Sequence, residues 1–449
     1  MSRLPRVAVG IVQPGADSQA VTWALMDVLA RADVQVQHFL SRACFTPLEA
    51  ATSITGLSSR HLDSWLMQPH VCRELFARGA SAASFALVEG CYTSARCPYQ
   101  STGGSLDELC SWLDLPRLAI VDATRMRDCC PPPRPEQVDG IFLDRVADDR
   151  DYFRQQTHLE ALWGVPVLGG LPRLDSLRAE VAALPGGTAL PRRLCSALGE
   201  ALARTANIGR LVALAAERDF QASRPTLFAR EEDETRLRVA VAFDDAFGCY
   251  FPDSLELLEQ RGATVIDFSP LRDEALPPGV DVVYFGCGHP ERYAEELAGN
   301  LCMAAALRNH LCTGRRIYAE GGGAAYLCQS LETPDGTVPM AGVLPAVARL
   351  NPQPAPPRAV EARLGKRCWL GAAGARVRGY LNSHWNIEPA GPLTSHLAGQ
   401  PQGGDLVGRH HAIGSRLHLD FAAQPHLLNG FLHPHAACLE VAQSRSRQG

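Results

Sequence analysis

The stretch RRIYAEGGGAAYLCQSL (315–331) decides the fold of the second half of this chain. Its pattern predicts a buried strand that ends at Glu320, a glycine turn over 321–323 and a helix from Ala324 onward. A strand, a sharp glycine turn and a helix form a nucleophile elbow, which lifts one side chain clear of a sheet. The tip of this elbow falls on Gly321, which has no side chain to present.

The sequence around this elbow predicts two α/β domains. In the first half, candidate strands alternate with helices, which is typical of a parallel, doubly wound sheet. The charged segment RDFQASRPTLFAREEDETR (218–236) predicts a linker, so we expect domains at 1–217 and 237–449. We also expect one helical stretch over 190–217 and a surface excursion over 351–366. The candidate strands of the first domain are 6–12, 34–40, 84–90, 115–123, 138–146 and 165–172.

Composition excludes several classes of protein. The net charge of −5 over 449 residues argues against a nucleic-acid partner, which normally requires a basic surface. No apolar run approaches the roughly 18 residues that span a membrane, and the N-terminus lacks the apolar core of a signal peptide. The 15 cysteines are scattered without a CxxC pair, which predicts a reduced cytoplasmic protein.

Five ordered motifs between Val239 and Phe431 carry a family resemblance. They are DDAFGCYFPDSLELLEQRGA (244–263), FSPLRDEALP (268–277), GCGHPERYAEELAGN (286–300), YAEGGGAAYL (318–327) and GSRLHLDF (414–421). In these motifs the chain resembles the glutamine amidotransferase domain of cobyrinate a,c-diamide synthases, which amidate two carboxylates of a corrin ring. The resemblance implies an N-terminal P-loop NTPase-like sheet and a C-terminal class I glutamine amidotransferase-like sheet.

The same resemblance implies a nucleotide site after the first strand, at GIVQPGADSQAV (10–21). There Gly10 remains, but Pro14 replaces a glycine and removes an amide donor, and Asp17 stands where the family has a lysine. Ser18 is left either to contact Mg²⁺ or, like Asp17, to cap the following helix in an ordinary βα turn. ATP and Mg²⁺ are therefore expected only if the ancestral activity survives.

The resemblance also implies a catalytic centre in the second domain. In the family a cysteine thiolate attacks the glutamine amide, and Gly321 occupies its position here. His418 matches the activating histidine, and Asp420 is expected to orient it. The residual catalytic set is thus His418, Asp420 and Glu320. Cys287, in the oxyanion loop GCG (286–288), and Cys328 are the alternative thiols, although Cys328 lies too far along the helix to reach the tip.

Histidines concentrate near the C-terminus, where eight of the 14 lie between His384 and His435. Imidazoles that lie close together can bind a transition metal or ligate the iron or cobalt of a tetrapyrrole. The candidate metal set is His410, His411 and His418. The alternative is that these histidines are solvated or structural, because their spacing matches no tight motif.

Together these features predict a non-catalytic homologue of the synthases that binds a tetrapyrrole or corrinoid, or a protein partner, through the family's substrate cleft. One alternative is an enzyme that still amidates tetrapyrrole carboxylates with ammonia. Another is a structural subunit, and a homodimer is compatible with either. The implied cleft residues are Asp63, Glu89, Arg272, Asp273 and Arg378.

Overall fold

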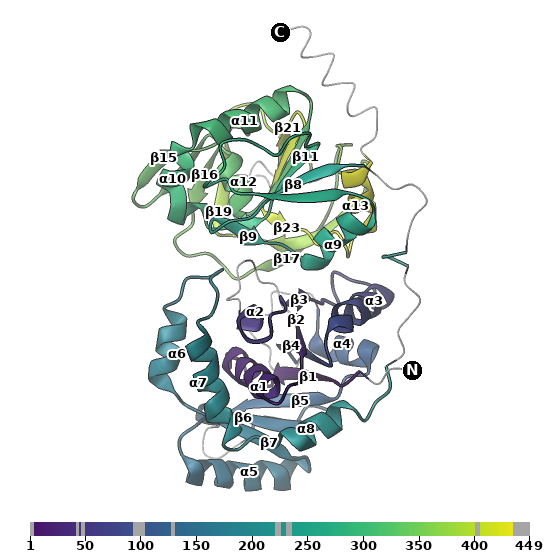
Figure 1. The fold of residues 1–449 in the computed structure, drawn as a ribbon, viewed down its shortest axis with the longest axis vertical. Coiled ribbons are helices and arrows are strands. Elements are labelled where there is room, and N and C mark those ends of the chain that lie inside the picture. The colour runs from purple at the N-terminus through teal and green to yellow at the C-terminus, as the bar shows by residue number, and fades with distance from the viewer. Residues whose placement is uncertain are drawn as a thin grey trace. The chain divides into compact units, whose positions relative to one another are not determined.

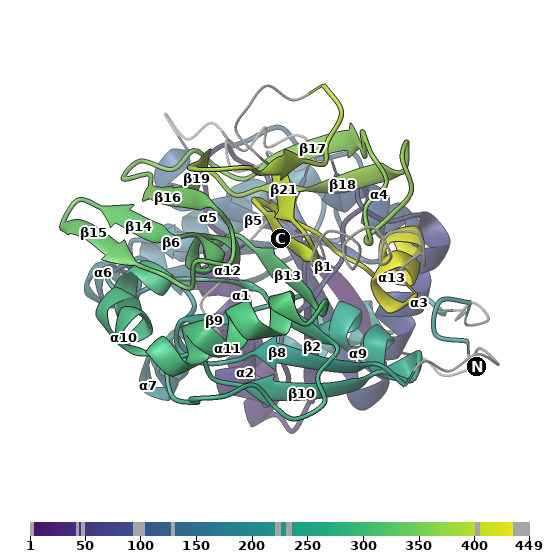
Figure 2. The same cartoon turned by 90° about the horizontal axis from the view of Figure 1, so that it is seen from above.

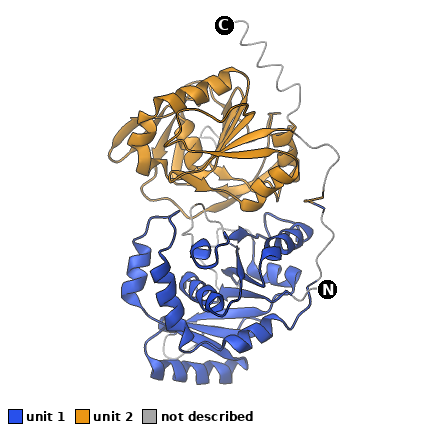
Figure 3. Ribbon diagram, in the orientation of Figure 1, with its two compact units in different colours: residues 1–43, 47–226 blue, residues 44–46, 227–449 orange. Residues whose placement is uncertain are grey.

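The computed structural model of the chain describes residues 4–41, 45, 50–92, 104–126, 131–220, 226–229, 236–399 and 405–433. The chain divides into two compact units, one of residues 1–43 and 47–226 and the other of residues 44–46 and 227–449 (Figure 3). The division after Thr226 falls inside 218–236, of which 221–225 and 230–235 lie outside the described residues. None of the described helices is long and apolar enough to cross a membrane.

The first unit is built on a seven-stranded sheet in which every pairing is parallel. The strand order is β3-β2-β4-β1-β5-β6-β7, so the doubly wound sheet expected from the alternating strands and helices is confirmed. All six residues of the central β1 are buried, as expected where helices cover both faces. The strands are β1 (Arg6–Ile11), β2 (Val36–Leu40), β3 (Arg60–His61), β4 (Phe85–Cys91), β5 (Arg117–Asp122), β6 (Gly140–Val146) and β7 (Val167–Pro172).

Helices connect these strands, and α1 packs against α7 (Figure 1). The expected single helix over 190–217 is instead two helices, α7 and α8. The break follows from Asn207, whose side chain accepts a hydrogen bond from the backbone N–H of Arg210 and so begins a new helix. The helices are α1 (Gln19–Arg31), α2 (Ala50–Thr55), α3 (Pro69–Gly79), α4 (Leu106–Leu113), α5 (Asp149–Trp163), α6 (Asp175–Ala182), α7 (Arg192–Ala203) and α8 (Ile208–Ala215).

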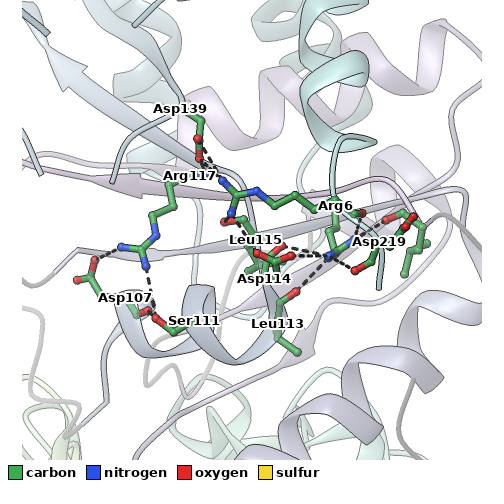
Figure 4. Close-up of polar contacts among 11 residues, drawn as sticks. Arg6, Asp107, Ser111, Leu113, Asp114, Leu115, Arg117, Asp139 and Asp219 are labelled. Carbon is green, nitrogen blue, oxygen red and sulfur yellow. Dashed lines mark hydrogen bonds and ion pairs between the residues drawn. The ribbon is translucent and has the colours of Figure 1, made fainter. Parts of the chain in front are cut away.

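A fully buried arginine at the start of β1 fixes the chain that follows α8 (Figure 4). Arg6 Nε donates to the carbonyl of Leu113 at 3.0 Å, and its terminal nitrogens donate to four further carbonyls. Two of these carbonyls belong to Arg218 and Asp219, the others to Leu4 and Asp114. The hydrogen bonds compensate for the desolvation of the guanidinium and tie 218–219 to the sheet.

The second unit contains a mixed seven-stranded sheet with the order β10-β8-β11-β13-β22-β21-β20. Strands β10, β8, β11, β13 and β22 are parallel, and β21 and β20 continue the sheet antiparallel. The sheet strands are β8 (Arg238–Ala242), β10 (Thr264–Phe268), β11 (Val282–Phe285), β13 (Arg316–Glu320), β20 (Thr394–Ser395), β21 (Leu406–Arg409) and β22 (Ala412–Ser415). The helices of this unit are α9 (Pro252–Gln260), α10 (Ala294–Gly299), α11 (Leu301–Cys312), α12 (Gly322–Leu327) and α13 (Pro425–Leu432).

Three smaller sheets complete this unit, and one of them includes part of the segment 351–366. That segment contains β17 (Arg358–Arg363), which pairs antiparallel with β18 (Arg376–Leu381). β18 in turn pairs with β23 (Leu417–His418), so part of the expected surface excursion is a strand of a sheet. Figure 2 shows the four-stranded sheet of β14 (Ser330–Thr333), β15 (Gly336–Pro339), β16 (Ala346–Leu350) and β19 (Trp385–Pro389); β9 (Phe247–Cys249) and β12 (Cys287–Gly288) form a pair.

Candidate functional site

The predicted elbow is present at the carboxyl end of β13, in the middle of the second unit's main sheet. Gly321 follows the strand with φ of +49° and ψ of −116°, and α12 begins at the next residue. A positive φ combined with this ψ is strained for any residue with a side chain, and it is the conformation of a sharp strand-to-helix turn. Gly322 is needed for a different reason, because a Cβ there would lie 2.3 Å from the carbonyl oxygen of Gly288.

The space that a side chain at Gly321 would enter is occupied by the thiol of Cys287. A Cβ built on Gly321 would lie 2.8 Å from Cys287 Sγ, which is closer than real contacts allow, and 3.1 Å from Asn382 Nδ2, which is tighter than most. Cys287 is fully buried, and this burial raises the pKa of its thiol well above the ordinary value. The neighbouring Cys249 and Glu320 act in the same direction, so the thiol is neutral at physiological pH.

An imidazole and a carboxylate lie beside this thiol. His418 Nδ1 is 2.6 Å from Glu320 Oε2, and the His418 ring stacks on Phe251 with centroids 4.2 Å apart. The other oxygen of Glu320 accepts hydrogen bonds from the Tyr318 hydroxyl at 2.7 Å and the Leu419 N–H at 3.1 Å. Cys287, Glu320 and His418 each offer one atom within 4.8 Å of the other two.

The orienting carboxylate differs from the one expected. We expected Asp420 to orient His418, but the carboxylate 2.6 Å from the imidazole is that of Glu320. Asp420 Oδ1 accepts hydrogen bonds from Ser254 Oγ at 3.0 Å and from the backbone N–H of Ala422 at 2.9 Å. These contacts hold the turn before α13, so Asp420 acts there as a local cap.

The loop expected to stabilise an oxyanion has one of its donors engaged elsewhere. The N–H of Gly286 donates to the hydroxyl of Tyr250 at 2.9 Å, and that hydroxyl donates to the carbonyl of Ala242. A preorganised oxyanion hole requires backbone N–H groups that point at the reacting oxygen. The alternative thiol, Cys328, follows the last residue of α12 and donates to the Ala324 carbonyl at 3.3 Å, and burial raises its pKa to about 12.

In the first unit, the loop after β1 turns carbonyl groups rather than amides toward a charged partner. Arg125 donates to the carbonyl of Pro14 at 2.9 Å and to that of Gly15 at 2.5 Å. Phosphate recognition by such a loop depends on amide donors and a cation, and this loop presents acceptors. A Cβ on Gly10 would lie 2.6 Å from a methyl carbon of Leu106, so a side chain at this position would require Leu106 to shift.

Asp17 and Ser18 have different roles at the start of α1. Asp17 Oδ1 accepts the N–H of Gln19 at 3.0 Å, which is the local turn proposed for it. Ser18 is the N-cap by position, but its side chain makes no capping bond and donates instead to Glu89 Oε1 at 2.5 Å. Glu89 Oε2 lies 3.1 Å from His38 Nε2, which extends a buried polar chain at the carboxyl ends of β1, β4 and β2.

The remaining predicted cleft residues lie in local hydrogen-bonded structure. In the first unit, Asp63 accepts the N–H groups of Trp65 and Leu66 at 2.7 and 3.2 Å. In the second unit, Asp273 accepts the N–H of Ser269 at 2.7 Å, and the exposed Arg272 lies 3.9 Å from Asp245. Arg378 Nε donates to Glu361 at 2.7 Å across the β17–β18 pair.

The predicted metal set of His410, His411 and His418 is not brought together. The parallel register pairs Ile317 with Ala412 and Glu320 with Ser415. His410 and His411 therefore lie at the start of β22, whereas His418 follows its other end, about 13 Å further along at 3.3 Å per residue. Burial lowers the pKa of His411 as well, as expected for a structural imidazole.

Sequence reasoning missed two residues of the elbow region, Tyr250 and Asn382. The Tyr250 hydroxyl engages Gly286, and the Asn382 amide lies against Gly321 and Cys287. Tyr250 lies inside the motif 244–263, and its position there was the available signal. Asn382 lies outside the five motifs, so no signal of this kind marked it.

Both units are α/β layer structures, and the second contains a glycine elbow. These features define a protein of the glutamine amidotransferase-containing class. A family profile described as a CobB/CobQ-like glutamine amidotransferase domain matches residues 238–424. The cobyrinate a,c-diamide synthase of Methanothermobacter thermautotrophicus is 30% identical over 322 residues, which are 67% of this chain and 69% of that protein. The chain belongs to the cobyrinate a,c-diamide synthase family, as the motifs had indicated.

Other members match along nearly their whole length. The synthase of Syntrophotalea carbinolica is 27% identical over 95% of this chain and 98% of its own, and that of Salmonella typhimurium is 28% identical over 93% and 95%. Among solved structures, a glutamine amidotransferase covers 46% of this chain and 98% of its own at 17% identity and a TM-score of 0.34. The signal recognition particle receptor FtsY of Elizabethkingia anophelis covers 49% and 66% at 12% identity and a TM-score of 0.29.

Proposed function

We propose that this protein binds a corrin-type tetrapyrrole carboxylate without amidating it from glutamine. The tetrapyrrole part of the proposal rests on descent, because the relatives are named for cobyrinate. The observation that carries the loss of amidation is the pairing of Gly321 with Cys287 at the elbow. Gly321, at the position of the family nucleophile, has no side chain, and the neutral, buried thiol of Cys287 fills the space beside it.

Three features of the second unit argue against glutamine hydrolysis. A thiolate is the attacking species, and burial together with Glu320 disfavours the thiolate of Cys287. The Gly286 N–H that could stabilise an oxyanion already donates to Tyr250. His418 contacts Glu320 tightly, but it has no thiolate to activate at the tip of the elbow.

The loop after β1 argues against nucleotide binding in the family manner. Asp17 places a negative charge where a lysine would neutralise phosphate, and Arg125 is engaged by the loop carbonyls. A second activity, amidation with ammonia, would still require activation of the carboxylate by a nucleotide. We therefore expect neither glutamine nor ammonia to support turnover.

The test measures binding and turnover in one experiment. Cobyrinate is mixed with the full chain, Mg-ATP and either glutamine or ammonium, and the corrinoid is analysed by absorbance and by mass spectrometry. We expect a shifted corrinoid spectrum and no amidated product. Release of glutamate from glutamine is measured in parallel, and the Cys287→Ser variant serves as the control. If the wild type releases glutamate and this variant does not, Cys287 is a relocated nucleophile.

Two results would overturn the proposal. An amidated product with either nitrogen source would show that a nucleotide site operates in spite of Asp17. An unchanged corrinoid spectrum with no product would exclude tetrapyrrole binding. It would favour a structural role with a protein partner or with a second copy of the chain. Size-exclusion chromatography with light scattering distinguishes these last two.

A further inference from the structure

A second polar cluster in the unit of residues 227–449 consists of His289, Glu291 and His384. His289 directly follows β12, Glu291 lies in the short 3-10 helix Pro290–Tyr293, and His384 directly precedes β19. Glu291 Oε1 is 2.8 Å from His289 Nδ1 and 3.2 Å from His384 Nε2. The side chains are 15%, 13% and 27% exposed, so the cluster is accessible to small ions but not fully solvated.

The distances from Glu291 Oε1 to the two imidazole nitrogens, 2.8 and 3.2 Å, are close to those between neighbouring ligand atoms of a metal ion. Metal–ligand bonds of about 2.1 Å with tetrahedral or octahedral angles place neighbouring ligand atoms roughly 3.0–3.4 Å apart. The three residues each offer one atom within 4.8 Å of the other two. The imidazole rings meet edge to face, with centroids 5.7 Å apart and an interplanar angle of 89°, so they converge on the carboxylate rather than stack on each other.

The carboxylate has an oxygen that the protein does not use. Within the described part of the chain, Glu291 Oε2 is buried and has no hydrogen-bond partner, while both imidazoles share Oε1. A buried carboxylate oxygen normally accepts at least one bond, so the orphaned atom points to a missing partner.

Hydrogen bonds of the main chain hold the backbone of both histidines in place. The N–H of His289 donates to the Ala246 carbonyl at 2.9 Å, which fixes the chain between β12 and the 3-10 helix. The N–H of His384 donates to Asn382 Oδ1 at 2.9 Å, and the His384 carbonyl accepts the N–H of Asn351 at 2.8 Å. Ligands whose backbone is fixed lose little freedom when an ion binds.

We propose that His289, Glu291 and His384 bind a divalent transition-metal ion of the Zn²⁺ type. Two imidazole nitrogens and one carboxylate oxygen are a donor set that such ions favour, and three protein ligands leave coordination positions open for water or a small ligand. The proposed metal site does not depend on the proposed tetrapyrrole binding. The proposed ligands Glu291 and His384 are 93 residues apart in the sequence, so a bound ion would link two distant segments.

The test compares metal binding by the full chain and by variants. The protein is stripped with a chelator and titrated with Zn²⁺ by calorimetry, and with Co²⁺ so that visible absorption reports coordination. Glu291→Gln keeps an oxygen for the two histidines but removes the charge, and His384→Gln removes a ligand. His158→Gln, which changes an exposed histidine of α5, is the matched control.

We expect Glu291→Gln and His384→Gln each to weaken one Zn²⁺ site by at least about 100-fold, since even partners of metal ligands contribute 10–100-fold. The Co²⁺ absorption of that site disappears with it, and the control matches the wild type. Equal stoichiometry and affinity in all four proteins would mean that the cluster is a hydrogen-bonded network only. Loss of the site in Cys287→Ser alone would place the ion at the buried Cys287–Glu320–His418 group and would equally refute the proposal. Thermal unfolding of the metal-free variants shows whether each retains its fold, and Glu291→Gln suffices if His384→Gln does not.

Discussion

Exchanging the residues at positions 287 and 321 tests whether the two positions share one space. The structure brings Cys287 Sγ to 2.8 Å from the Cβ that Gly321 lacks. The variant Gly321→Cys therefore places two side chains in a volume that holds one, and Cys287→Gly leaves that volume empty. The double variant contains one thiol again, now attached to the elbow.

The expected magnitudes follow from this geometry. Gly321→Cys should destabilise the second unit by about 1–3 kcal/mol through overpacking and by about 1–3 kcal/mol through the positive φ of +49°. Cys287→Gly should lose about 2 kcal/mol, because it removes a fully buried side chain and leaves a cavity. In the double variant the overpacking and the cavity cancel while the backbone strain remains. We expect it to be about 3–5 kcal/mol more stable than the sum of the single changes predicts, because both of these terms are removed.

The assay must report on the second unit, because the chain has two. Cys328 is fully buried in that unit and is present in all four proteins, so pulse alkylation across a urea series followed by peptide mass spectrometry measures its exposure. The four midpoints give a double-mutant cycle. Effects that add within about 0.5 kcal/mol would refute the shared space, because independent sites add to that degree.

Two further predictions concern buried charged groups. Burial lowers the pKa of His310 to about 4, below its unfolded value of about 6.5, so the unfolded chain binds more protons and stability falls as the pH drops between these values. His310→Gln keeps an N–H donor for the Arg316 carbonyl. It should remove about 3 kcal/mol of the change in unfolding free energy between pH 7 and 4. An unchanged dependence of the unfolding free energy on pH would show that His310 is not its source. Arg6→Met leaves five carbonyl groups without their donor and should destabilise the first unit by about 3 kcal/mol or more, seen as a lower melting temperature. Arg193→Met, which changes an exposed arginine paired with Glu180, is the control, and equal effects of the two substitutions would show that the Arg6 bonds contribute little.

The sequence predicted the elements of the fold because their signals are local. Continuous apolar runs located β1 and β4–β7 to within two residues, since strands in a parallel sheet are buried on both faces. Glycines marked the elbow, although α12 begins at Gly322 and not at Ala324. The order of the strands and the pairing of β17 depend on contacts between distant segments, which no local pattern records.

The sites were less predictable because they depend on which groups face each other. His411 and His418 are close in sequence, but β22 separates them in space. His384 and Glu291 are 93 residues apart and lie 3.2 Å from each other. Likewise, only the structure shows that the carbonyls of Pro14 and Gly15 face Arg125.

Gly321 and Cys287 illustrate how two substitutions can be misread when each is considered alone. From the sequence alone, we expect the first to be the loss of a nucleophile and the second an intrusion into an oxyanion loop. In space, the thiol of Cys287 fills the volume next to the bare elbow, so the two positions are packed as a pair. At the tip, a thiol would project from a turn at the amino end of α12; on the strand, burial and Glu320 keep the sulfur protonated. A buried thiol beside the bare elbow can therefore keep the core packed, and the positive φ at Gly321 persists because the chain around it still requires the turn.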